Sequence, residues 1–204
     1  MRDRFRRYPV TAGYLLAVTG LALLMRFVFA DGMTAQVRES LSTNPANLAD
    51  HPVNALLGSA FVLDPGDGVV FTLVALVASA LCLGRFEREV GPWRAAGVAT
   101  LGHVGATLVT AAVIASGAYA ADLTRATDLG VTYVAFTAAG AVTAFAPVVL
   151  RGPWLALLVA CPLLSAEWLD GVPEHGAIGH VAAAFIGSGC GAFAVHRVYA
   201  SAGR

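Results

Sequence analysis

Residues 177–198 read AIGHVAAAFIGSGCGAFAVHRV. This run, charged only at its penultimate residue, is long enough to cross a bilayer as one helix, because about 20 apolar residues span the hydrocarbon core. Small residues recur within it at every fourth position, at Gly179, Ala183, Gly187 and Gly191. Such a stripe lets a second membrane helix approach closely, because packing rather than hydrophobicity drives helix association in lipid. The segment predicts a membrane helix that packs tightly against a neighbour.

The composition of the whole chain agrees with a membrane protein. Of its 204 residues 57% are hydrophobic and 13% are charged, and the mean hydropathy is +0.71. Soluble domains carry roughly 25% charged residues, so the composition excludes a soluble globular protein and leaves no room for a separate soluble domain. The net charge of zero argues against a nucleic-acid partner. We expect a single transmembrane domain over residues 1–204.

Six apolar segments predict an all-α, polytopic six-helix bundle. They lie near residues 10–29, 69–86, 95–118, 129–150, 154–169 and 177–198. Pro147 and Pro162 should end or kink their helices, because proline removes a backbone donor and clashes with the preceding turn. The arginines that precede the first segment resemble the start of a signal peptide, but the apolar stretch is longer than an ordinary signal-peptide core. Its length favours an uncleaved helix.

The distribution of charge predicts the orientation of the bundle. One side carries three acids, Asp3, Glu87 and Glu89, and ten arginines, Arg2, Arg4, Arg6, Arg7, Arg85, Arg88, Arg94, Arg151, Arg197 and Arg204. The opposite loops carry Arg38 and Arg125 against ten acids, Asp31, Glu39, Asp50, Asp64, Asp67, Asp122, Asp128, Glu167, Asp170 and Glu174. Because arginine accumulates in cytoplasmic loops, we expect both termini in the cytoplasm and the long loop 30–68 outside.

Residues 55–63 (ALLGSAFVL), within loop 30–68, are strongly apolar. A stretch of this length is too short to span a bilayer. Two interpretations fit it equally: the segment enters the interface or re-enters the membrane against the bundle, or it is a loop helix packed on the external surface.

Thr132 and His180 are the candidate catalytic residues. Thr132 follows the external Asp128 by four residues, and His180 follows the external Glu174 by six, so both should lie within a few ångströms of the external interface at a rise of about 1.5 Å per residue. Small and hydroxyl residues line one face of the fourth segment, at Thr132, Ala135, Ala139 and Thr143. If the fourth and sixth helices pack together, a hydroxyl and an imidazole meet beside external water. That is the arrangement of a nucleophile and its general base.

Three stretches carry motifs in a recognisable order. The second segment ends GRFEREVG over residues 84–91, the fourth opens GVTY over 130–133, and the sixth holds Gly179-His180 followed by Ala183 and Gly187. Together they resemble the rhomboid family of intramembrane proteases. Rhomboids close their second helix with G-x-x-E-x-x-x-G, carry the nucleophilic serine in Gly-x-Ser-Gly, and place the base histidine in A-H-x-x-G-x-x-x-G. The stretches STN at 42–44, NL at 47–48 and SAF at 59–61 resemble the first loop of a divergent bacterial rhomboid-like subset.

The resemblance implies a six-helix rhomboid-like fold in a bacterial plasma (inner) membrane, with Thr132 in the place of the serine and His180 in the place of the base. The departures fall on the catalytic machinery. Rhomboids bind the oxyanion with a His and an Asn of H-x-x-x-N on the second helix, and the corresponding positions here are Phe71 and Ala75. Loss of one oxyanion donor costs about 10²–10³ in rate. Tyr133 also replaces the glycine that follows the nucleophile.

Three functional hypotheses follow. The first is a proteolytically inactive or degenerate rhomboid-like protein that recognises transmembrane segments of client proteins, with Thr132 and His180 as a static hydrogen-bonded pair. The second is an active intramembrane protease with a Thr132–His180 dyad, whose oxyanion hole consists of backbone N–H groups. The third is a small transporter or channel with His103 as its polar waypoint, although an interhelical hydrogen bond also explains that histidine. We expect the lipid bilayer as a partner and no cofactor or metal; the sequence leaves the oligomeric state open.

Overall fold

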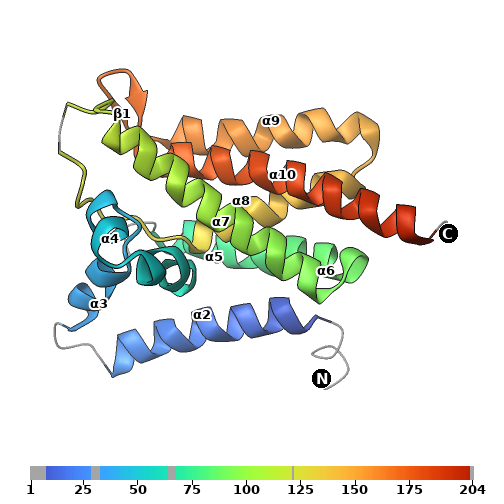
Figure 1. Cartoon of the computed structure of the whole chain (residues 1–204), viewed down its shortest axis with the longest axis horizontal. Coiled ribbons are helices and arrows are strands. Elements are labelled where there is room, and N and C mark those ends of the chain that lie inside the picture. The colour runs from blue at the N-terminus through green and yellow to red at the C-terminus, as the bar shows by residue number, and fades with distance from the viewer. Residues whose placement is uncertain (1–7, 29–32, 64–67, 121, 203–204) are drawn as a thin grey trace.

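The computed structural model describes residues 8–28, 33–63, 68–120 and 122–202. Within them, five helices are long and apolar enough to cross a membrane, and a shorter apolar helix lies among these five (Figure 1). The expected all-α membrane bundle is therefore the observed fold. Several charged residues used to predict the orientation lie outside the described residues: Arg2, Asp3, Arg4, Arg6, Arg7, Asp31, Asp64, Asp67 and Arg204.

The N-terminal helix α2 (Pro9–Phe27) lies along one side of the bundle and leads towards the helices of the first loop (Figure 1). These are α3 (Met33–Leu41), α4 (Pro45–Asp50), the short π-helix η1 (Asn54–Gly58) and the 3₁₀ turn η2 (Ser59–Phe61). Helices α2 and α4 both start with proline. Proline suits this position because the N–H that it lacks would have no acceptor within the helix.

The apolar segment 55–63 forms η1 and η2, which pack against the bundle. Tyr14 of α2 donates a hydrogen bond to the carbonyl oxygen of Ala60 at 3.0 Å, and Ser59 is fully buried. Leu57 and Phe61 are exposed. The segment therefore turns Ser59, Ala60 and Val62 towards the bundle and Leu57 and Phe61 outward.

The second span is a continuous run of α5 (Gly68–Ala78), the π-helix η4 (Ser79–Leu83) and α6 (Gly84–Val90). It ends at Gly91, whose φ of +86° is a conformation that glycine adopts without the steric penalty of a side chain. Pro92 directly follows and begins α7 (Pro92–Ala115). The glycine–proline pair therefore makes an abrupt turn between two membrane helices.

Glu87 of α6 fixes the start of α2. Its carboxylate is 2% exposed and accepts hydrogen bonds from the backbone N–H groups of Val10 and Thr11, each at 2.8 Å, and from the Thr11 hydroxyl at 2.7 Å. A negative charge is favourable here because the first N–H groups of a helix lack acceptors and carry the positive end of its dipole. The carboxylate thus joins the first two spans.

The short helix α8 (Val131–Ala141), extended by the 3₁₀ turn η5 (Val142–Phe145), occupies the centre of the bundle. Nearly every residue of α8 is buried. It is shorter than the predicted segment 129–150 because Pro147 favours an extended conformation at the preceding residue, and Ala146 indeed has ψ of 146°. Because its residues are buried, surrounding helices rather than lipid cover this span.

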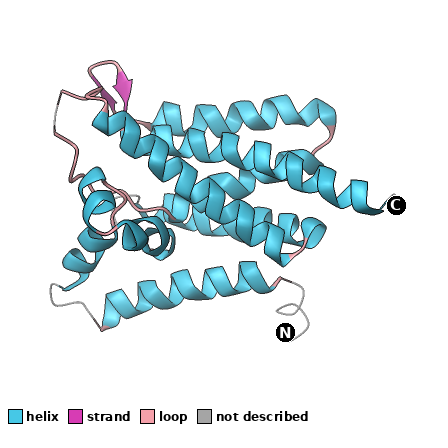
Figure 2. Cartoon of the chain, in the orientation of Figure 1, coloured by secondary structure: helices cyan, strands magenta, loops and turns pink. Residues whose placement is uncertain are grey.

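Helix α9 (Val148–Ser165) begins six residues before the predicted segment 154–169. Arg151 in its first turn donates hydrogen bonds to the carbonyl oxygens of Ala144 and Ala146, which the end of a helix leaves without helical donors. The helix continues past Pro162 to Ser165. A short hairpin of β1 (Trp168–Leu169) and β2 (Val172–Pro173) then leads to α10 (His175–Ala202), as Figure 2 shows.

The small-residue stripe of α10 packs directly on α8, as the sequence predicts. A Cβ added at Gly187 would lie 2.1 Å from the carbonyl oxygen of Thr137, and one added at Gly191 would lie 2.7 Å from the Cα of Ala141. Of the face expected at positions 132, 135, 139 and 143, Thr132 and Ala139 do contact α10, through His180 and Ala184, but the glycines of the stripe meet α8 at Thr137 and Ala141, which lie outside that face. Since successive helix residues are about 100° apart, the contact with α10 is broader than expected and extends around α8 to this second face.

Candidate functional site

Thr132 and His180 form a hydrogen bond where α8 and α10 begin. Thr132 is the second residue of α8 and is 4% exposed, and His180 lies in the second turn of α10. The distance from His180 Nε2 to Thr132 Oγ1 is 2.8 Å. The close approach of the two helices along the glycine stripe brings together these residues, which lie far apart in the sequence.

Aromatic rings surround the His180 imidazole. Phe136, one turn along α8 from Thr132, stacks on it with centroids 4.7 Å apart and an interplanar angle of 25°. Tyr133 meets it edge-on at 5.2 Å, and Phe71 of α5 lies at 6.0 Å. These contacts fix the plane of the imidazole without using its nitrogens.

Phe71 stands at the position where the sequence comparison predicts an oxyanion donor. Its ring lies beside His180, so α5 approaches the candidate dyad. The side chain has no polar atom, however, and neither has the buried Ala75 one turn further along. This helix therefore contributes apolar surface to the site and no side-chain hydrogen bond.

Tyr133 connects the site to the first loop through a buried carboxylate. Its hydroxyl donates to Asp128, with distances of 2.9 and 2.8 Å to the two carboxylate oxygens. Thr43 of the loop donates to the same carboxylate at 2.7 Å, and the Ser42 hydroxyl accepts from the Asp128 N–H at 2.9 Å. Sequence reasoning did not identify this network, although it singled out the stretch 42–44, and an acid lies five residues before the unusual tyrosine.

Tyr133 also explains why α10 carries glycine at position 179, beside the candidate base His180. A Cβ added at Gly179 would lie 2.3 Å from the tyrosine hydroxyl oxygen. The large ring at 133 and the missing side chain at 179 are therefore complementary. A glycine after Thr132 would leave this space empty.

His103 of α7 lies in a second hydroxyl–imidazole contact. The residue is 2% exposed, and its Nε2 is 3.1 Å from the hydroxyl of Ser59 in η2. Gly130 lies against the ring, since a Cβ there would come within 1.9 Å of it. The contact ties the first loop to α7 and to the start of α8, which agrees with a packing role for this histidine.

The arrangement at Thr132 supplies part of what acyl transfer needs. The hydroxyl and the imidazole lie within hydrogen-bond reach, as a nucleophile and base require. The first-turn N–H groups of α8 have no acceptor within the helix and are the nearest source of oxyanion donors. Among the described residues, no group of three His, Cys, Asp or Glu side chains is arranged to hold a metal ion.

Comparison with known proteins identifies one family. The sequence model of the family described as rhomboid-like protein matches residues 5–200. No curated protein and no solved structure gives a significant match.

Proposed function

Because this chain belongs to the rhomboid-like protein family, we propose that it is a degenerate member that recognises transmembrane segments of client proteins without cleaving them. It acts as one domain over residues 1–204, in the plasma membrane of a bacterium and with both termini in the cytoplasm. The excess of arginine on one side of the chain supports this orientation.

The apolar ring of Phe71 beside His180 is the observation that carries the proposal. An oxyanion forming at Thr132 would face this ring and Ala75 rather than two polar side chains. The β-methyl of threonine also restricts rotation about χ1, and Tyr133 occupies the space next to it. The Thr132–His180 hydrogen bond then serves to satisfy two polar groups and to hold α8 against α10, because an unsatisfied polar group inside a membrane is costly.

The same hydrogen bond supports a second candidate, an intramembrane protease that uses Thr132 as nucleophile and His180 as base. At 2.8 Å the hydroxyl is within reach of the base. The first-turn N–H groups of α8 would then bind the oxyanion alone. This candidate predicts that Thr132→Ser preserves or raises the rate, because serine keeps the hydroxyl and removes the methyl group.

A cleavage assay separates the two candidates. Purified protein in proteoliposomes is incubated with single-span substrates whose membrane helices contain destabilising residues, beside Thr132→Ala, Thr132→Ser and His180→Ala. We expect no cleavage by the wild type. Cleavage by the wild type that both alanine variants abolish would overturn the proposal and establish the protease.

Client recognition is tested in the same vesicles by photo-crosslinking. A photoreactive amino acid replaces Val74, which is exposed on α5 one turn from Phe71. The matched control replaces Leu16, which is similarly exposed on α2, remote in sequence from the site helices. We expect the substrates to crosslink at position 74 well above the level at position 16, and equal crosslinking at both would contradict recognition near the candidate site.

A further inference from the structure

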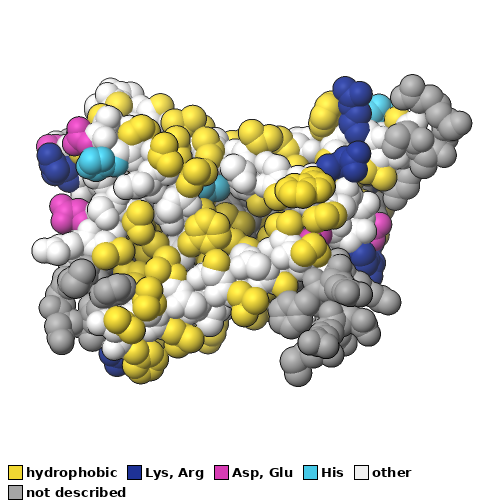
Figure 3. All heavy atoms as spheres, turned by 60° about the horizontal axis from the view of Figure 1, so that its bottom comes forward, with side chains coloured by type: hydrophobic (Ala, Val, Ile, Leu, Met, Phe, Trp, Pro, Cys, Tyr) yellow, Lys and Arg dark blue, Asp and Glu magenta, His cyan; other side chains and the backbone are white. Residues whose placement is uncertain are grey.

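The hairpin between α9 and α10 begins where α9 reaches one boundary of the membrane. Helix α9 has 18 residues and is about 27 Å long at a rise of about 1.5 Å per residue, close to the roughly 30 Å hydrocarbon core of a bilayer. On the face of the molecule in Figure 3, hydrophobic side chains fill the middle and most charged side chains gather towards the two ends. The β1–β2 hairpin lies at one of these ends, directly after α9 (Figure 1).

Helix α9 faces lipid along most of its length. Leu150, Leu157 and Leu164 follow one another at every second turn, so they share one face of the helix, and all three are exposed. Only 11% of the helix is buried inside the protein. The surface at the end of α9 is therefore continuous with the lipid-facing side of the bundle.

Trp168 extends this apolar surface beyond the end of α9. Its indole Nε1–H donates a hydrogen bond at 3.3 Å to the carbonyl oxygen of Leu163, which belongs to the last turn of α9, where carbonyls lack donors within the helix. The indole has no other polar atom, and the residue is 57% exposed. The hydrogen bond thus holds the ring against the end of α9 and leaves an apolar surface outside.

Hydrogen bonds fix the hairpin that carries this ring. Asp170 and Gly171 have φ of +50° and +86°, and positive φ at both central residues is typical of the tight type I′ turn. Pro173, which pairs with Trp168 across the hairpin, accepts a hydrogen bond from the Tyr119 hydroxyl at 2.8 Å. A short, tethered turn therefore presents the indole.

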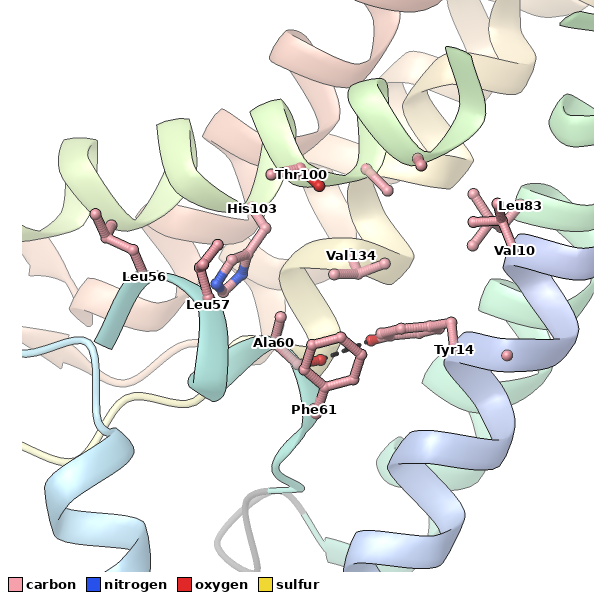
Figure 4. A pocket seen from close by; sticks show the side chains of 13 residues that line it. Val10, Tyr14, Leu56, Leu57, Ala60, Phe61, Leu83, Thr100, His103 and Val134 are labelled. Carbon is pink, nitrogen blue, oxygen red and sulfur yellow. Dashed lines mark hydrogen bonds between the residues drawn. The ribbon is translucent and has the colours of Figure 1, made fainter. Parts of the chain in front are cut away.

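The contacts of the described residues do not cover the exposed part of Trp168. Phe61, for comparison, contacts the Tyr14 ring with centroids 5.6 Å apart and lines the apolar hollow between α2, η1, η2 and α7 (Figure 4). Trp168 lines neither that hollow nor the one between α9 and α10. The rings that contact His180 come from α5 and α8, so these contacts do not place the indole over the candidate dyad.

Two acidic residues set the depth of the ring. Glu167 directly precedes Trp168, Asp170 lies at the tip of the hairpin, and both are exposed. Because a carboxylate is costly in hydrocarbon, these residues keep the turn out of the acyl core. Tryptophan itself prefers the boundary between membrane and water.

We propose that the β1–β2 hairpin is a membrane anchor, in which the Trp168 indole lies at the boundary between lipid headgroups and acyl chains beside the end of α9. The partner is the surface of the bilayer, and the anchor fixes the depth of a helix that the bundle itself covers little. This inference is independent of the proposed function and of any cleavage activity.

Tryptophan quenching in phosphatidylcholine proteoliposomes tests the proposal. The chain holds Trp93, Trp154 and Trp168. In a Trp93→Phe background, the fluorescence that Trp168→Phe removes belongs to Trp168. One set of vesicles carries bromine on acyl carbons near the headgroup, a second carries it near the chain end, and a third contains iodide on both sides of the membrane. We expect the bromine near the headgroup to quench Trp168 most and iodide to quench it least.

Thr127→Trp, made in the protein that keeps only Trp154, provides the aqueous control. Thr127 is exposed in the polar loop after α7, which also carries the exposed Asp122 and Arg125. We expect iodide to quench position 127 several-fold more strongly than position 168. Strongest quenching of Trp168 by iodide would place the hairpin in water, strongest quenching by the deep bromine would place it in the acyl core, and no quenching would place it beneath protein. Each of these results would overturn the proposal.

Two substitutions separate the lipid contact of Trp168 from its hydrogen bond to Leu163. Trp168→Phe keeps an apolar ring without the N–H, whereas Trp168→Gln keeps an N–H donor without the ring. We expect amide hydrogen exchange of residues 168–173 in the vesicles to stay near the wild-type rate in Trp168→Phe and to rise several-fold in Trp168→Gln, with circular dichroism confirming that each protein is folded. The reverse order, or equal rates in all three proteins, would contradict the anchor.

Discussion

The hydroxyl of Tyr133 lies 2.8 Å from Oδ2 of Asp128, in a buried contact between the first turn of α8 and the segment that precedes it. The same carboxylate accepts a hydrogen bond from Thr43, so one acid connects the central helix to the first loop. The tyrosine ring in turn contacts His180 edge-on. The residue that replaces a small glycine beside the candidate nucleophile therefore stabilises the loop over the site.

Tyr133→Phe should lower the free energy of unfolding by about 1.5–3 kcal/mol, because a hydrogen bond to a buried carboxylate is lost while the ring is kept. Chemical denaturation in mixed micelles measures the change. Tyr119→Phe is the control, since Tyr119 donates to the neutral carbonyl of Pro173 and its loss should cost about 1 kcal/mol. If Tyr133→Phe lowered the free energy of unfolding less than Tyr119→Phe, Asp128 would have found other hydrogen-bond donors.

Glu87→Gln should destabilise the fold by about 2 kcal/mol, because an amide supplies one acceptor oxygen where two carboxylate oxygens accept three hydrogen bonds. The thermal midpoint in detergent provides the measurement. Glu89→Gln is the control. Glu89 lies two residues away, and the substitution removes only exposed ion pairs with Arg85 and Arg88, which are worth about 0–1 kcal/mol. Equal losses in the two variants would refute the capping of α2 by Glu87.

Gly187→Ala should destabilise the packing of α8 on α10 by about 1–3 kcal/mol, because the new methyl group meets the Thr137 backbone at 2.1 Å. Gly189→Ala, on the same helix, introduces a methyl group with nothing within 4 Å. It should be neutral or stabilise by up to about 1 kcal/mol through helix propensity. Steric trapping or denaturation of both variants compares them, and a neutral Gly187→Ala would mean that the helices separate at little cost.

The stability of the fold should fall slightly as the pH rises through the titration of Glu174. Burial raises the pKa of this carboxyl, and the nearby Glu167 adds to the rise while His175 opposes it. A raised pKa means that the folded state binds the proton more tightly, so the protonated form contributes stability below the unfolded pKa and loses it above the folded pKa. Between about pH 4 and pH 7, the free energy of unfolding should decline less for Glu174→Gln than for the wild type. The difference should be under about 1 kcal/mol, because the group is partly exposed. Identical profiles for the two proteins would contradict this role.

The sequence by itself determined the fold class, the approximate spans and the meeting of two helix starts. These follow from local quantities: long apolar runs specify membrane helices, and the glycines of α10 allow a close neighbour. The shortening of the fourth span follows from Pro147, which the sequence also marked. The order of the motifs indicated the rhomboid-like family that the family comparison identified.

Only the tertiary structure decided which face of α8 meets α10, and which side chains surround the candidate site. The contact at Tyr133, Thr137 and Ala141 depends on the rotation of one helix about its axis, and helix periodicity fixes that rotation only when one face differs clearly from the others. In α8 nearly every residue is apolar or small and buried, so no face stands out in the sequence. The connections from Thr43 to Asp128 and from Ser59 to His103 join residues 85 and 44 positions apart. They depend on how the loop folds back over the bundle, which local sequence does not specify.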